Sequence, residues 1–538
     1  MKISYIKRTT IFLASFVLIG SALVAQNIEL PEVTTVISAD AEKAEKDALP
    51  DFSDVLELPN GSGGVEPELP GLESSGKAEI ASSPLPKSEK SVYAEGLIGG
   101  GYPMSFTGNI SVFRSVGESP FRFNFEHNSA LGYSNHSLID NFSDRETKLE
   151  IRKSYKKNNL NWTAGGAYKS SSDGLQGNLT SNGQIISLFN RDTYSADGAI
   201  SYSFANGFEI GTSADALFYN RYAEQPCPAI PTFSYSQLTP SAFVKWQGYG
   251  FDIGFDATYS FSAEMHKELA FQNGHRGQFG AHIEWKNDFV KLYGNTAAVV
   301  GNLINNNAVI VPFTLGIDAS FPVYFANRRF SILAEGGIKS EKTALNELEE
   351  KYKFSEINYN ASESSDWYGK LAFTIPLKTA FTGNASIEYR QTAYGNKTFE
   401  PDYTSSEYIY MIHEKAHQLF ITDFLLSYHY EDITINGEWR SNWMDVPALE
   451  TTQLVSFGIN WQDNKSRYGA DISVTLPINS EVETPVLNTE AFVRLTSSVR
   501  AILSVNDIIK LYTGEPRYFA GKYAARGGSA LVLLKFFF

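Results

Sequence analysis

The segment MIHEKAHQLF, residues 411–420, contains the residue types of a zinc-dependent hydrolase. His413, Glu414 and His417 stand in the order His-Glu-x-x-His. On a helix, positions four apart share a face, so both imidazoles could bind one zinc ion beside a glutamate base. On a strand, the two histidines would lie ~13 Å apart at about 3.3 Å per residue, which is too far to share a metal. The conformation of this segment therefore decides whether zinc chemistry is feasible.

The residues that follow the motif indicate a strand. In QLFITDFLLSYHY, every second residue from Phe420 to Tyr430 lies on one face, and most of these residues are apolar or aromatic. Extended backwards, this alternation places His413 and His417 on the opposite face, toward the lumen, and Glu414 on the same face as Phe420. We therefore predict that no zinc is bound here. A loop helix that ends before Gln418 is the alternative.

Other catalytic patterns are missing from the sequence. It contains no GxSxG, GxxxxGK[ST] or CxxC motif. Its single cysteine, Cys227, stands between two prolines, where we interpret it as an incidental loop residue. We predict that the protein is not an enzyme and uses no cofactor or metal. The formal net charge of -15 gives no indication of a basic surface for nucleic acid.

Two segments precede the main part of the chain. Residues 1–25 resemble a secretory signal peptide, because Lys2, Lys7 and Arg8 precede an apolar run and small residues follow it. An uncleaved anchor is the alternative. Residues 26–90 are rich in proline, glycine and serine, and their fourteen acidic residues against five lysines give a net charge of -9. We predict that they form a mostly disordered periplasmic arm or linker.

Residues 91–538 alternate between apolar and polar side chains with a period of two. In FDIGFDATYSF, Phe251 and Phe255 alternate with Asp252 and Asp256. Aromatic residues make up 14% of the chain, and no run after the signal segment approaches the ~20 apolar residues of a membrane helix. Short links alternate with long loops, as in outer-membrane barrels. We predict an all-β fold, a transmembrane antiparallel up-and-down β-barrel of about 22 strands (range 18–24). A large soluble β-protein is the alternative.

The C-terminal stretch ALVLLKFFF places Phe536 and Phe538 on one face of the last strand. A final strand with an aromatic last residue resembles the signal that outer-membrane barrels present to the barrel-assembly machinery. We therefore expect this machinery and the lipid of the outer membrane as partners. A core strand that happens to be last is the other interpretation.

The end of the chain also resembles that of TonB-dependent receptors. An asparagine-plus-apolar segment, Val505 to Ile509, is followed by Tyr512, a loop and Arg526-Gly527 before the last strand. Just after the signal segment, a short run matches the TonB-contacting segment of such receptors: Val33, Thr34, Thr35, Val36 and Ile37. The resemblance implies a barrel of this size and a TonB-like partner. It also implies a globular plug, whereas residues 38–90 have the composition of a linker, so we expect the plug to be missing.

Many charged residues fall on the predicted lumen face. They are Arg122, Glu126, Lys148, Glu150, Arg152, Asp252, Asp256, Glu388, Arg390, Asp423, Glu438, Arg440, Asp471 and Arg494. Solvated or mutually paired charges are the simplest interpretation, and the functional one is a channel whose charges select its solute. A barrel of this size normally holds a plug, and we expect inward-folded loops and the arm to fill this one. Another protein that closes or uses the pore is the alternative.

These patterns predict a channel or transporter in the outer membrane of a diderm bacterium. It would pass a small solute or nutrient that the sequence does not identify. The alternative is a surface-exposed interaction protein, an adhesin or assembly partner that acts through its long loops.

Overall fold

The computed structural model describes residues 92–538 with gaps. The gaps are residues 115–118, 132–141, 175–179, 182–183, 186–187, 224–231, 265–272, 303–308, 324–327, 343–344, 352–362, 379, 395–397, 403–410, 447–450, 479–482, 520–522 and 526. The expected signal peptide, the arm, the TonB-contacting run, the place where a plug would stand, and Cys227 lie outside the described residues. Within the described residues, no helix is long and apolar enough to cross a membrane.

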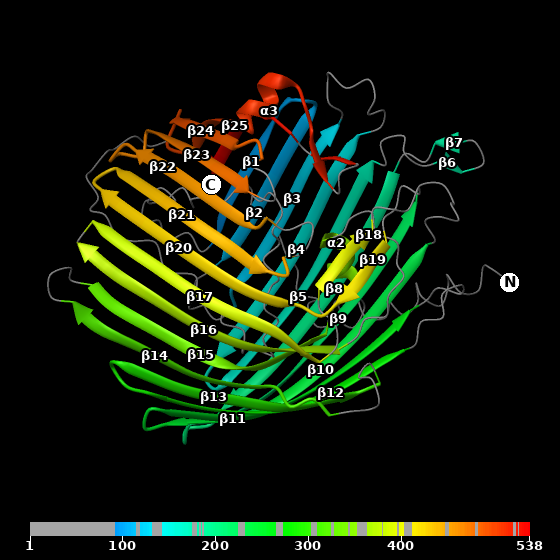
Figure 1. The fold of residues 1–538 in the computed structure, drawn as a ribbon, viewed down its shortest axis with the longest axis vertical. Coiled ribbons are helices and arrows are strands. Elements are labelled where there is room, and N and C mark those ends of the chain that lie inside the picture. Colours follow the sequence, from blue (N-terminus) through cyan, green and yellow to red (C-terminus); the bar gives the residue numbers. More distant parts are fainter. Residues whose placement is uncertain are drawn as a thin grey trace. The chain divides into compact units, whose positions relative to one another are not determined.

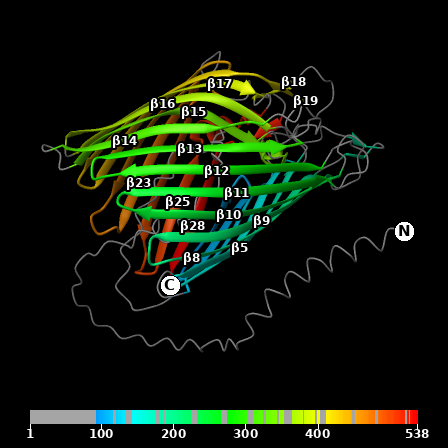
Figure 2. The same cartoon turned by 90° about the horizontal axis from the view of Figure 1, so that it is seen from below.

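The main architecture is one antiparallel sheet of 22 strands that closes on itself (Figure 1). Each strand pairs with its neighbours in chain order, and β1 (Tyr93–Tyr102) closes the circle by pairing with β28 (Ser529–Phe537). Figure 2 shows β8 to β17 side by side as one wall. The predicted up-and-down barrel and its strand count are therefore confirmed.

Between these two strands the barrel contains twenty others. They are β2 (Ser105–Arg114), β3 (Phe121–Leu131), β4 (Ser143–Lys157), β5 (Leu160–Gly174), β8 (Leu188–Ser203), β9 (Phe208–Ala223), β10 (Phe233–Gly248), β11 (Phe251–Glu264), β12 (Gly274–Lys286), β13 (Val290–Gly301), β14 (Phe313–Val323), β15 (Arg328–Lys342), β16 (Glu363–Lys378), β17 (Phe381–Tyr394), β20 (Gln418–Tyr430), β21 (Ile433–Met444), β22 (Gln453–Gln462), β23 (Tyr468–Ile478), β24 (Val486–Arg494) and β25 (Val499–Asn506).

Smaller elements stand in the longer connections. Three are hairpins: β6 (Thr180–Ser181) with β7 (Gln184–Ile185), β18 (Thr398–Asp402) with β19 (Met411–Lys415), and β26 (Arg517–Phe519) with β27 (Tyr523–Ala525). Two are short helices, α2 (Leu345–Lys351) and α3 (Ile508–Thr513). The first two hairpins lie at one end of the barrel, on the right in Figure 1.

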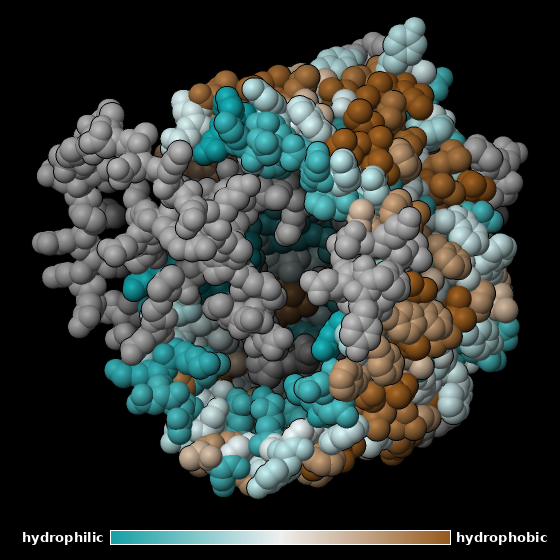
Figure 3. All heavy atoms as spheres, turned by 90° about the vertical axis from the view of Figure 1, so that its left-hand side faces the viewer, coloured by the Kyte–Doolittle hydropathy of each residue, from teal (hydrophilic) through white to brown (hydrophobic). Residues whose placement is uncertain are grey.

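The strands separate an apolar outer face from a more polar inner face. Phe255, Phe279 and Leu315 are 59%, 64% and 64% exposed, and Figure 3 shows apolar residues over much of the outer wall. Such exposure suits contact with lipid, because water would disfavour a continuous apolar band. β8, β9 and β10 have 16 residues each. A bilayer crossing needs about 9–11, so these strands extend beyond the membrane.

The short turns use residues with a left-handed backbone. Asn158 (φ 54°) connects β4 to β5, Glu431 (φ 48°) connects β20 to β21, and Tyr249-Gly250 (φ 53° and 82°) connects β10 to β11. Tight turns of positive φ match the right-handed twist of the strands that they join. The sequence predicts short links at Lys157-Asn158, Glu431-Asp432 and Gln247-Gly248, and the first two of these turns lie within one residue of the predicted links. The third follows Gln247-Gly248, the predicted link, because β10 continues through those residues.

Candidate functional site

The His-Glu-x-x-His segment is extended, as the alternation predicts. Met411–Lys415 form β19, which pairs with β18, so the alternative loop helix is wrong. His417 follows β19 and is buried, 7% exposed. Its Nε2 lies 3.8 Å from Oδ2 of Asp366, and its Nδ1 lies 3.2 Å from Oγ1 of Thr392. Among the described residues, no group of three possible metal ligands occurs.

The charges predicted for the lumen face are distributed around the wall. Asp252 and Asp256 alternate with the exposed Phe251 and Phe255. Arg390 donates to Glu388 at 2.5 Å. In the strand register, Arg122 lies opposite Arg152, Glu126 opposite Lys148, Asp423 opposite Arg440, and Glu438 opposite Leu425. Arg152 also donates to Asp197 at 3.0 Å. The role of these charges in solute selection stays a prediction.

A carboxylate from a loop binds the inner wall of β8 and β9. Glu349 belongs to α2, in the connection between β15 and β16, and is 1% exposed. Arg221 Nη1 donates to its Oε1 at 2.7 Å, and the Tyr219 hydroxyl donates to its Oε2. Arg191 Nη1 donates to its backbone oxygen at 2.9 Å. Figure 1 shows α2 beside β8 and β9.

Two arginines face each other at this point of the wall. Arg191 of β8 lies directly opposite Arg221 of β9, and both side chains are almost fully buried. Like charges in this position repel. Asp173 of β5 accepts from Arg191 and compensates one charge, while Glu349 compensates the other. The ring of Phe189 lies 5.6 Å from the Arg191 guanidinium and 5.3 Å from that of Arg221. The result is a cationic, aromatic-floored niche that Glu349 fills.

These arginines lie on the inner face of the barrel. On β8 and β9 the even-numbered Tyr194, Ile200, Phe208 and Ile210 are 44–47% exposed and face outward. Side chains alternate along a strand, so the odd-numbered Arg191 and Arg221 face inward. Burial raises the pKa of Glu349 above its ordinary value, although Arg221 and the Tyr219 hydroxyl oppose this shift.

Both ends of the α2 connection also contact other strands of the wall. Lys342, the last residue of β15, lies 3.3 Å from the Tyr235 hydroxyl of β10 and 3.1 Å from Ser262 of β11. Glu363, the first residue of β16, accepts from Arg276 of β12 at 2.8 and 3.0 Å. Strands β11 to β14 separate β15 from β10 along the wall. Contacts between β15 and β10 therefore cross the interior, and this connection occupies part of the lumen.

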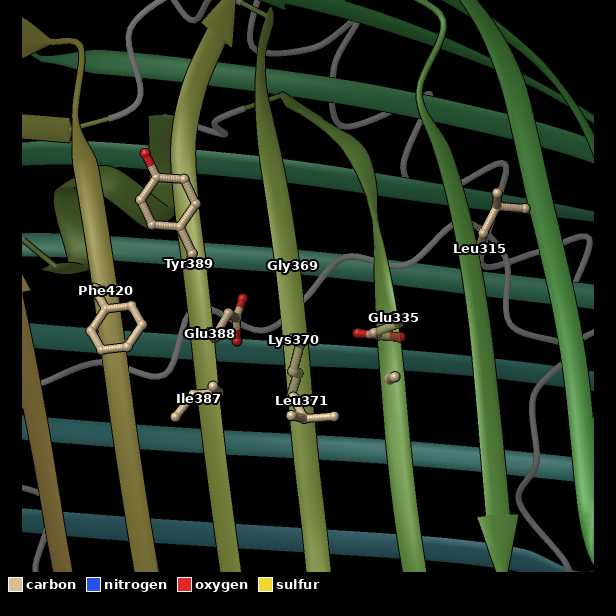
Figure 4. A pocket seen from close by; sticks show the side chains of 10 residues that line it. Leu315, Glu335, Gly369, Lys370, Leu371, Ile387, Glu388, Tyr389 and Phe420 are labelled. Carbon is tan, nitrogen blue, oxygen red and sulfur yellow. The ribbon is translucent and has the colours of Figure 1, made fainter.

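A second feature is an apolar groove between β14 and β20 (Figure 4). Leu315, Gly369, Tyr389 and Phe420 occupy one register row across these strands. Nothing lies within 4 Å of where a Cβ of Gly369 would stand, so the missing side chain leaves the groove open. Leu315 is 64% exposed on the outer face. A groove in this position suits hydrocarbon chains more than an aqueous solute.

Comparisons with known proteins give matches in structure but not in sequence. No family model and no curated protein matches the chain. The FrpB iron transporter from Neisseria meningitidis aligns with a TM-score of 0.62 and 10% identity, covering 84% of this chain and 83% of that one. The ferric enterobactin receptor PfeA from Pseudomonas aeruginosa, in complex with enterobactin, gives 0.61 and 10%, covering 84% and 82%. FpvA from P. aeruginosa bound to pyoverdine gives 0.54 and 12%, covering 83% and 72%.

The barrel has the fold of a TonB-dependent receptor. In this receptor-like barrel, Val505 to Ile509 span the end of β25 and the start of α3, and Tyr512 of α3 is 92% exposed. Asp507 accepts from Arg517 at 2.5 Å, which fixes the loop that follows. Phe538 donates its backbone N–H to Ala94 at 2.8 Å beside the closing pair of strands. Its recognition by the assembly machinery stays a prediction.

Sequence reasoning missed the niche in this receptor-like barrel. It identified neither Arg191 and Arg221 nor Glu349, because each is an ordinary charged residue in the sequence. The available signals were weak. Arg191 follows a long loop and Arg221 precedes one, and the connection after β15 contains the acidic residues Glu347, Glu349 and Glu350.

Proposed function

We propose that this protein is an outer-membrane transporter that passes a small solute through the interior of its barrel. The observation that carries this proposal is the closed barrel with an apolar exterior, aligned over most of its length with an iron transporter and a ferric enterobactin receptor. Seen from the end opposite the β6–β7 and β18–β19 hairpins, the barrel has a hollow lined by hydrophilic residues (Figure 3). A polar route through an apolar shell suits an aqueous solute and disfavours catalysis as the main role.

The same proposal assigns the partners. Outer-membrane lipid would contact the exposed aromatic and aliphatic side chains, and the assembly machinery would bind the strand that ends in Phe536 and Phe538. A TonB-like protein would contact the run from Val33 to Ile37. An iron-containing chelate is the solute class that the structural neighbours suggest, since their names refer to iron, enterobactin and pyoverdine.

Solute passage can be measured with the purified barrel. Refolded protein is inserted into planar bilayers and into liposomes loaded with a self-quenching dye. We expect discrete conductance steps, and solute flux that increases when the α2 connection (residues 343–362) is replaced by a short glycine-serine linker. A folded barrel that gives neither conductance nor flux, with or without this connection, would overturn the transport proposal and favour an interaction protein acting through its loops.

A further inference from the structure

The niche on β8 and β9 has the properties of an anion-binding site. The Arg221 guanidinium and the Tyr219 hydroxyl both donate to the Glu349 carboxylate, Arg191 donates to the backbone oxygen of the same residue, and Phe189 forms the floor. Arg191 and Arg221 are 5% and 2% exposed. Arginine is suited to such a site because its planar fork matches carboxylate geometry. Two buried arginines in direct opposition repel each other, and each binds a carboxylate: Arg191 that of Asp173 in the wall, and Arg221 that of Glu349 from the loop.

The anion present is part of the chain itself. Glu349 lies 128 residues from Arg221 in sequence and reaches it on a helix of only seven residues. α2 has a second ion pair with the same wall, between Glu350 and Lys169 of β5. These contacts stabilise α2 against the wall, and the desolvation of the Glu349 carboxylate offsets part of that stabilisation. A tethered group of this kind competes with a free ligand at an effective concentration set by its loop, typically in the millimolar range.

We propose that the Arg191–Arg221 pair is a binding site for a carboxylate-bearing solute and that Glu349 is its internal occupant, displaced when the solute binds. This inference rests on the proposed transport function, since the site faces the lumen through which solute would pass. Displacement removes α2 from the β8–β9 wall and widens the interior. The site thereby couples recognition of an anionic solute to opening of the passage.

The test uses the full mature protein in detergent, with glutarate as the probe because its carboxylates match the glutamate side chain. Binding is measured by calorimetry, and release of α2 by hydrogen exchange of residues 345–351. Glutarate should bind wild-type protein weakly and reduce protection of α2 in a saturable way. Glu349→Ala should bind glutarate about tenfold more tightly or better, because the internal competitor is gone.

Matched variants separate this site from general charge effects. Glu347→Ala removes the same charge from the exposed side of the same helix and should bind glutarate as wild type does. Arg221→Gln in the Glu349→Ala background should abolish binding, with folding checked by the heat-modifiable mobility of the barrel on gels. Glutaramide, which has the same shape without charge, should not bind.

Two results would overturn the inference. One is equal affinity of wild type and Glu349→Ala for glutarate, and the other is binding of glutaramide as tight as that of glutarate. These two binding results can be distinguished from a failure of the proposed transport function. A barrel that binds glutarate through Arg221 but conducts no solute would retain the site and lose the proposed role in transport.

Discussion

At the scale of single residues, the inner wall is organised by charge compensation across strands and loops. Arg221 with Glu349 and Arg276 with Glu363 join groups that are distant in sequence, at 2.7 and 2.8 Å. Removing one partner of a buried pair typically costs about 3–5 kcal/mol, because the other charge stays buried and uncompensated. The loop between β15 and β16 is therefore held by a few discrete contacts that a ligand or a change in protonation can alter.

Protonation of Glu349 should change how firmly α2 is docked. Burial raises its pKa in the docked state, whereas released α2 in water has the ordinary value. The docked state then binds a proton more tightly. Docking is most stable below the ordinary pKa and weakens as the pH rises through the raised pKa of the docked state. We expect hydrogen-exchange protection of α2, corrected for intrinsic exchange rates, to be greater at pH 5 than at pH 7.

The control for this dependence is Glu349→Gln, which resembles the protonated side chain and should make protection independent of pH. The groups that face Glu349 are Arg191, Arg221 and Tyr219, and Asp173 faces Arg191. Arginine and tyrosine ordinarily do not titrate between pH 5 and 7. Wild-type protection that increases from pH 5 to pH 7 would contradict the argument.

Sequence patterns predict the backbone conformation of a residue better than they predict which residues it contacts. The alternation after Gln418 placed the His-Glu-x-x-His segment in an extended conformation, which β19 confirms. The same alternation could not pair Arg191 with Arg221, because a shift of one residue in register reverses the face of every side chain. Glu349 was harder still to find, since loop geometry alone brings it to β9.

At the scale of elements, closure of the barrel depends on the fit between β1 and β28. A Cβ at Gly99 or Gly101 would collide with β28, at Val532 and Leu533 or at Ala530 and Leu531. Glycine is therefore required at Gly99 and Gly101, because it allows the backbones of the first and last strands to approach closely where they pair. The period-two pattern predicts both strands but does not reveal which glycines this seam requires.

Gly101→Ala should weaken the seam, whereas Gly96→Ala should not. The new methyl group at position 101 meets the backbone of β28, which cannot move aside as a side chain would. At position 96 the nearest atom is Asn109 O at 3.7 Å, an ordinary contact. Overpacking of this kind typically costs about 1–3 kcal/mol. We expect Gly101→Ala alone to lose its heat-modifiable folded form at a lower temperature on gels. Equal thermal stability of the two variants would argue against a tight seam.

At the scale of the whole molecule, the strand count follows from the sequence, whereas the filling of the lumen does not. Alternating strands with tight turns predict 22 strands because each crossing has a similar length. What lies inside depends on tertiary contacts. The connection with α2 supplies the inward loop that was expected, through Lys342, Glu349 and Glu363. Barrels of this size usually enclose a plug, and the arm is the second element that the sequence predicts inside this one.

The end of the barrel at which β1 starts contains a buried arginine, which favours contact with an acidic arm. Phe537 donates its backbone N–H to Ser498 in the short turn between β24 and β25, and β1 pairs with the same end of β28. Arg500 near this turn is 3% exposed. Its guanidinium lies 4.1 Å from the Phe492 ring, and its Nε and Nη2 have no hydrogen-bond acceptor among the described residues. A carboxylate of the arm, whose net charge is -9, is a suitable partner for this group.

Limited proteolysis can decide whether the arm enters the lumen. We expect residues 26–90 to be cut more slowly when the barrel is folded than after heat unfolding, because the wall shields an inserted arm. Salt at 1 M reduces the Debye length to about 3 Å, so it should accelerate cutting of the folded form if arginines hold the arm. A synthetic arm peptide, digested under both salt conditions, corrects for effects on the protease. Equal rates for folded and unfolded protein would exclude lumenal insertion and leave the α2 connection as the internal element that narrows the passage.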